Sequence, residues 1–93
     1  MFCVCVRNTV TNSIYWIMDR SNNLDYAISY ALEMYDDCRV EIWDDVLVLE
    51  TDAWGNIDPH KLVGYVGYDL DPRTGYMTRI NPVFVRMPKY KKI

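Results

Sequence analysis

The sequence contains few of the residues that most often build metal and catalytic sites. It has one histidine, His60, and three cysteines, Cys3, Cys5 and Cys38, among 93 residues. The odd number of cysteines argues against a closed disulfide framework. A closed zinc site needs four ligands and usually a C-x2–4-C spacing, which Cys3 and Cys5 do not have. We therefore expect no metal and no cofactor, and we expect these cysteines to pack as small hydrophobic residues.

Long apolar runs and familiar catalytic motifs are also missing. No stretch approaches the roughly 18 apolar residues of a membrane span. The apolar segment 1–6 is too short for a signal peptide, so we expect a reduced, cytoplasmic protein without a membrane anchor. No G-x-S-x-G, P-loop, H-E-x-x-H or G-x-G-x-x-G motif occurs, which argues against an enzyme. The remaining enzyme hypothesis uses His60 with Cys38 or Cys3 and Asp58.

Basic residues are scarce outside the C-terminus. The formal net charge is −3, yet residues 1–85 hold six basic residues against 13 acidic ones, a balance of −7. The acidity peaks over 33–58, where nine acidic residues face only Arg39. Such a surface repels nucleic acid and attracts basic partners. The last eight residues reverse the sign with Arg86, Lys89, Lys91 and Lys92.

What the sequence does contain is a clear helical period. Apolar residues recur at steps of three and four, which places them on one side of a helix at about 23–36: Leu24, Ala27, Ile28, Ala31, Leu32 and Tyr35. Ser21, Asn22 or Asn23 is expected to cap its start. Asp25 then falls in the first turn, where a negative charge meets the positive end of the helix dipole.

Strands are predicted where apolar and polar residues alternate or where β-branched and aromatic residues gather. These ranges are 2–7, 14–18, 39–43, 46–51, 62–69 and 76–80, and 83–87 allows a short seventh strand. Asp44-Asp45 is either a hairpin turn or a bend, and Asp71 to Gly75 is a strong turn.

The expected fold is therefore α+β: an antiparallel sheet of about five to seven strands with one amphipathic helix on one face, in the order ββ-α-ββ-ββ(β). Residues 1–88 form the domain, and 89–93 form a basic, mobile tail. The predicted core is Phe2, Val4, Val6, Trp16, Leu24, Ile28, Ala31, Leu32, Val40, Ile42, Leu47, Leu49 and Val66.

The outer side of the helix and the acidic segment after it form the predicted partner surface. Tyrosine is enriched at interface hot spots, and carboxylates attract basic partners. The predicted binding residues are Tyr26, Tyr30, Glu33, Asp36, Asp37, Glu41, Asp44, Asp45 and Trp54. The alternative is an ordinary solvated surface, with Tyr30 at the edge of the core.

The leading hypothesis is a non-catalytic protein-binding domain. By class-level analogy, it is a small acidic inhibitor of a basic, nucleic-acid-handling partner, of the kind that phages and mobile elements use against host defence nucleases. The alternative is a nucleic-acid-binding protein that uses the basic tail, with Tyr90 stacking on a base. A homodimer through the sheet face that the helix leaves uncovered is also open.

Overall fold

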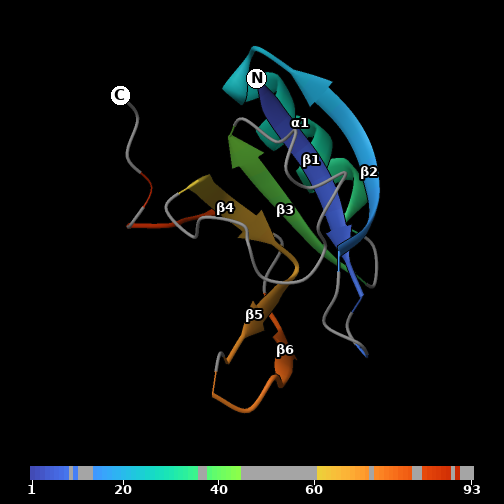
Figure 1. The fold of residues 1–93 in the computed structure, drawn as a ribbon, viewed down its shortest axis with the longest axis vertical. Coiled ribbons are helices and arrows are strands. Elements are labelled where there is room, and N and C mark those ends of the chain that lie inside the picture. Colours follow the sequence, from blue (N-terminus) through green and yellow to red (C-terminus); the bar gives the residue numbers. More distant parts are fainter. Residues whose placement is uncertain are drawn as a thin grey trace.

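A computed structural model describes residues 1–8, 10, 14–35, 38–44, 61–71, 73–80, 83–88 and 90 of the chain. Within these ranges lie one helix and seven strands (Figure 1). The elements are β1 (Phe2–Arg7), β2 (Ile14–Ser21), α1 (Leu24–Met34), β3 (Arg39–Asp44), β4 (Leu62–Val66), β5 (Tyr68–Leu70), β6 (Met77–Arg79) and β7 (Val85–Arg86). The predicted strand 46–51, with Leu47 and Leu49, lies outside the described residues.

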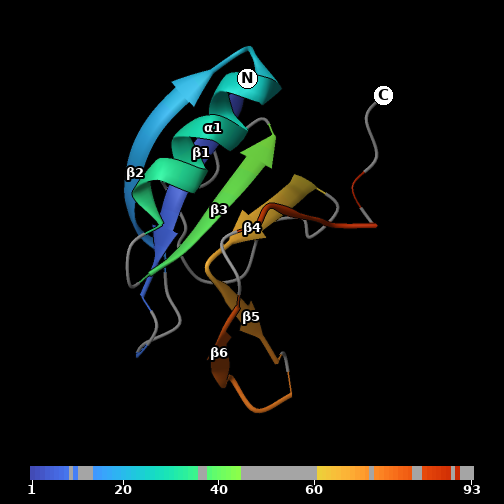
Figure 2. The same cartoon turned by 180° about the vertical axis from the view of Figure 1, so that it is seen from behind.

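Five strands form one antiparallel sheet in the order β2-β1-β3-β4-β7. The helix lies across one face of this sheet, over β1 and β3 (Figure 2). Strands β5 and β6 form a separate two-stranded sheet. The α+β class and the single helix on an antiparallel sheet are thereby confirmed. No helix in the described ranges has the length and apolar character needed to cross a membrane.

The helix begins where the sequence predicts a cap. Asn23 is the N-cap, and its side-chain oxygen accepts a hydrogen bond from the Tyr26 backbone N–H at 3.2 Å. This bond satisfies one of the free N–H groups that every helix start leaves. The helix ends at Met34, earlier than the predicted 36, with Tyr35 as C-cap. The Cys38 N–H then donates to the Tyr35 carbonyl at 2.8 Å and starts the turn into β3.

The main core lies between α1 and the sheet. Ala27 and Ala31 are fully buried, so the small side chains allow the helix axis to come close to the strands. The sheet residues of this core are Phe2, Val4, Val40, Ile42, Val63 and Val66. The predicted helix residues Leu24, Ile28 and Leu32 pack against this core from its edge and are only partly buried.

The sheet face opposite the helix is buried as well. Cys3, Cys5, Trp43 and Leu62 form a second cluster there, and Met87 packs against it. These four residues are at most 9% exposed within the single chain. The homodimer hypothesis assumes that the sheet face opposite α1 is uncovered. At these four positions that assumption is wrong.

The chain turns sharply between β4 and β5. The predicted strand 62–69 is divided at Gly67, whose φ of 100° lies in a region that side-chain-bearing residues rarely adopt. Beyond it, β5 and β6 form a hairpin that extends from the end of β4, away from α1 (Figure 1). The Asp71 N–H donates to the Tyr76 carbonyl at 2.9 Å and closes the predicted turn. We call residues 68–79 the hairpin arm.

We predict that Gly67→Asn destabilises the protein more than Gly75→Asn. Asparagine tolerates the ordinary left-handed region, so it fits Gly75, where φ is 74°. At Gly67 an added Cβ would lie 2.5 Å from the Cys38 carbonyl oxygen. The expected loss in free energy of unfolding is roughly 1–3 kcal/mol at Gly67 and below about 1 kcal/mol at Gly75. Urea denaturation measures both, and equal losses would contradict the role given to Gly67.

Candidate functional site

The outer side of α1 carries the part of the predicted partner surface that the structure describes best. Tyr26 is 47% exposed and Glu33 is exposed. Tyr30 is only partly exposed and packs against the core, so the edge-of-core interpretation fits this residue. The two tyrosine rings lie with centroids 6.1 Å apart and their planes tilted by 33°. They form a continuous aromatic ridge along the helix.

Tyr26 is held in place by the neighbouring edge strand. Its hydroxyl donates to Asp19 Oδ2 on β2 at 2.6 Å. This hydrogen bond is the main cause of the lowered pKa of Asp19 and of the raised pKa of Tyr26. Tyr26 therefore stays a neutral donor and Asp19 a charged acceptor at neutral pH. The exposed ring is thus restrained before any partner arrives.

The prediction that Glu41 belongs to the partner surface is wrong. Its side chain is 1% exposed and lies on the sheet face opposite α1. Its carboxylate accepts from Arg7 Nε at 2.8 Å and Arg7 Nη2 at 2.9 Å. It also accepts from Arg39 Nε at 2.6 Å and from Trp43 Nε1 at 2.9 Å. Four donors from β1 and β3 thus surround one buried carboxylate.

These donors keep Glu41 ionised. Burial acts to raise its pKa, but the hydrogen bonds and charges of Arg7 and Arg39 outweigh burial, and the pKa of Glu41 ends below its ordinary value. A buried charge without such partners would take up a proton instead. We call Glu41, Arg7, Arg39 and Trp43 the Glu41 network.

Arg39 connects this network to the hairpin arm. Its Nη1 donates to the Tyr68 carbonyl at the start of β5, at 2.6 Å. Its guanidinium carbon lies 3.9 Å from the centre of the Tyr65 ring, a cation–π contact. The Tyr65 hydroxyl in turn donates to the carboxylate of Asp69 on β5. One buried arginine therefore fixes where the arm leaves the main sheet.

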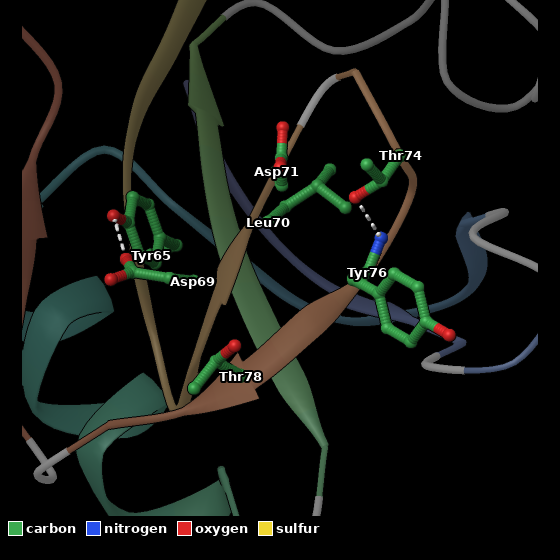
Figure 3. A pocket seen from close by; sticks show the side chains of 7 residues that line it. All are labelled: Tyr65, Asp69, Leu70, Asp71, Thr74, Tyr76 and Thr78. Atoms are coloured by element: carbon green, nitrogen blue, oxygen red, sulfur yellow. Dashed lines mark hydrogen bonds between the residues drawn. The ribbon is translucent and has the colours of Figure 1, made fainter.

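An open hollow of about 790 Å³ lies beside the arm. Figure 3 shows the Tyr65–Asp69 hydrogen bond on one side and the Thr74–Tyr76 hydrogen bond on the other. The hollow is lined by Tyr65, Asp69, Leu70, Asp71, Thr74, Tyr76 and Thr78. This lining offers carboxylates and hydroxyls but no cysteine, histidine or lysine. It suits a polar or cationic group better than a covalent reaction.

The remaining predicted site residues fall into two groups. Asp44 is partly exposed and accepts a hydrogen bond from the Tyr90 hydroxyl at 2.8 Å. Burial and then this bond raise the pKa of Tyr90 to about 12. Tyr90 is partly buried and also packs against the main core. The others lie outside the described residues: Asp36, Asp37, Asp45, Trp54 and His60.

Comparison with known proteins gives no relative from which a function could be transferred. No family model, no curated protein and no solved structure matches the chain. Across the part of the chain that the structure describes, no group of three or more His, Cys, Asp or Glu side chains is placed to hold a metal. The function must therefore be argued from the surfaces themselves.

The alternation of charged and apolar residues on two strands could have predicted the Glu41 network. The count of acidic residues along the sequence could not. Arg7 alternates with Val4 and Val6, and Glu41 alternates with Val40 and Ile42. If the valines and isoleucine face the core, the charged residues must share the opposite face of adjacent strands. Opposite charges on one sheet face then predict an ion pair.

We predict that Glu41→Gln destabilises the protein by about 3–5 kcal/mol, because it removes the charge of a fully buried carboxylate that the buried Arg39 binds. Asp71→Asn is the matched control. It removes one charge from the Asp71–Arg73 pair, which is 3.8 Å long with side chains 40% and 90% exposed. Exposed pairs contribute at most about 1 kcal/mol. Chemical denaturation at neutral pH compares the two variants, and similar losses would contradict a stabilising carboxylate at Glu41.

The lowered pKa of Glu41 also predicts how the free energy of unfolding changes in acid. The pKa of Glu41 is lower in the folded protein than the ordinary value of 4.5. Its ionisation therefore stabilises the fold above pH 4.5, and this contribution is lost as the pH falls through the folded pKa. The difference in unfolding free energy between wild type and Glu41→Gln should stay constant down to pH 4.5 and narrow below it. Denaturation across that range tests this, and a constant difference in strong acid would contradict it.

Proposed function

We propose that the chain is a non-catalytic protein-binding domain that docks the outer side of α1 on a basic surface of a partner protein. The observation that supports this best is the exposed ring of Tyr26, which Asp19 restrains from β2. Tyrosine is among the residues that most often dominate binding energy at interfaces. A ring already held in place loses less side-chain freedom on binding.

The charge of this surface favours a basic partner. The helix contains Asp25 and Glu33, both exposed, and no lysine or arginine. Asp19 adds a third carboxylate beside Tyr26. Carboxylates around an aromatic anchor raise the rate of encounter with a positive surface and disfavour negative ones such as nucleic acid. The binding should therefore weaken as salt rises.

The finer proposal is that the partner is a basic, nucleic-acid-handling protein and that docking inhibits it. Proteins of this class expose dense arginine and lysine surfaces for phosphate groups. An acidic helix with a tyrosine anchor competes for such a surface by the same electrostatics. This step rests on the chemistry of the surface and on analogy with small acidic inhibitors of mobile elements.

We predict that capture of the partner from a lysate of the source organism depends on Tyr26 and Glu33. Tyr26→Ala should weaken binding at least about tenfold, because it removes the anchor ring. Glu33→Gln should weaken it less and reduce its salt dependence. Thr78→Lys, which makes the same change of net charge on the distant hairpin arm, is the control and should have little effect. Affinity capture at low and high salt, read by quantitative mass spectrometry, measures these effects.

Two outcomes would contradict the proposal. One is capture that is equally strong with wild type and Tyr26→Ala. The other is capture that Thr78→Lys weakens as much as Glu33→Gln does, since general charge would then explain the binding. Tyr26→Phe separates the two roles of Tyr26, because it keeps the ring and removes only the hydrogen bond to Asp19.

A further inference from the structure

The register of the hairpin arm places four of the residues that line the hollow on one face. β5 and β6 pair with Asp69 opposite Thr78. The Asp71 backbone then bonds to that of Tyr76, two positions further along each chain segment. Residues two apart on a strand share a face, and so do residues directly opposite each other on paired strands. Two carboxylates, an aromatic ring and a hydroxyl are therefore presented together, and all four line the hollow.

The carboxylate of Asp69 is held in place before any ligand arrives. It accepts a hydrogen bond from the Tyr65 hydroxyl, and the Tyr65 ring in turn contacts the Arg39 guanidinium at 3.9 Å. Burial and then the hydrogen bond raise the pKa of Tyr65, so its hydroxyl keeps the proton at neutral pH. Arg39 has its own counter-charge in Glu41. A positioned acceptor loses less freedom when a ligand binds.

The negative charge of the hollow is poorly balanced. The Tyr65 hydroxyl is a neutral donor, and in the described part of the chain no ion pair involves Asp69. Asp71 has only a loose pair with Arg73, 3.8 Å long, and the Arg73 side chain is 90% exposed. Both contacts of Asp71 use Oδ1. The lining contains two carboxylates and no lysine, arginine or histidine, so it attracts a cation.

The two sides of the hollow differ in chemistry. Figure 3 shows Tyr65 and Asp69 at one side and Tyr76 at the other. The Tyr76 side chain is 76% exposed, so its ring offers an apolar surface to a ligand. A ligand that spans the hollow needs a cationic head for Asp69 and an apolar stem for the ring. An arginine side chain has both, and its planar head can form two parallel bonds to one carboxylate.

We propose that the hollow is a docking site for an arginine side chain of another protein. The carboxylate of Asp69 is the main acceptor for the guanidinium, and the ring of Tyr76 packs against the stem. No covalent step takes place. The site lies on the hairpin arm, which extends away from α1 (Figure 1), and it does not depend on the docking proposed for that helix.

The test is an NMR titration of the isotope-labelled full chain with the blocked peptide acetyl-Gly-Arg-Gly-amide. Amide shifts should saturate and should be centred on the residues that line the hollow. The same peptide with citrulline, a neutral isostere of arginine, should bind at least about tenfold more weakly because it lacks the charge. The lysine peptide should bind roughly threefold more weakly, because an ammonium group cannot form the two parallel bonds. Methylguanidinium, which has the head without the stem, should bind at least about tenfold more weakly.

Asp69→Asn is the decisive variant. Its amide oxygen can still accept from the Tyr65 hydroxyl, so the arm keeps its hydrogen bond while the charge is lost. The affinity for the arginine peptide should fall about fivefold. Glu33→Gln removes one charge from α1 instead and is the matched control, which should bind the peptide as wild type does.

Two further variants separate this site from the docking surface of α1. Thr78→Lys places a cation in the hollow and should abolish the saturable shifts without affecting capture of the partner by α1, whereas Tyr26→Ala should have the opposite pattern. Tyr76→Ala should weaken peptide binding, and unchanged binding would remove the role of its ring. Citrulline or methylguanidinium binding as tightly as the arginine peptide would overturn the proposal. So would shifts centred on α1, no saturable shift in wild type, or equal losses in Asp69→Asn and Glu33→Gln.

Discussion

The buried carboxylate of Glu41 is the constraint on which the sheet depends. An unpaired charge in this position would cost several kcal/mol, so the chain must bring donors to it. Arg7 can reach Glu41 because β1 and β3 pair with Cys5 opposite Glu41 and Arg7 opposite Arg39. A slip of one residue would turn Arg7 toward the helix and leave Glu41 short of donors. We infer that the main value of the network lies in fixing this register, since buried ion pairs often add little net stability.

The same carboxylate also controls where the hairpin arm lies. Glu41 orients Arg39, and Arg39 binds the Tyr68 carbonyl and the face of Tyr65. Gly67 supplies the sharp turn that lets β5 start at this point. The position of the hollow beside the arm therefore depends on residues of the main sheet. The two tyrosine rings of α1 depend instead on the hydrogen bond from Tyr26 to Asp19. The two surfaces can change independently in sequence.

The sequence predicted those elements that local patterns determine. The apolar period and the expected cap located α1, alternation located β1, and the gathering of β-branched and aromatic residues located β3. Local patterns could not predict interactions between residues that are far apart in the sequence. Glu41 was counted with its acidic sequence neighbours, although its real neighbours in space are Arg7, 34 positions earlier, and Arg39. The hydrogen bond between Tyr90 and Asp44 joins residues 46 positions apart, and no local pattern could indicate it. Such contacts depend on strand order, which the sequence left open.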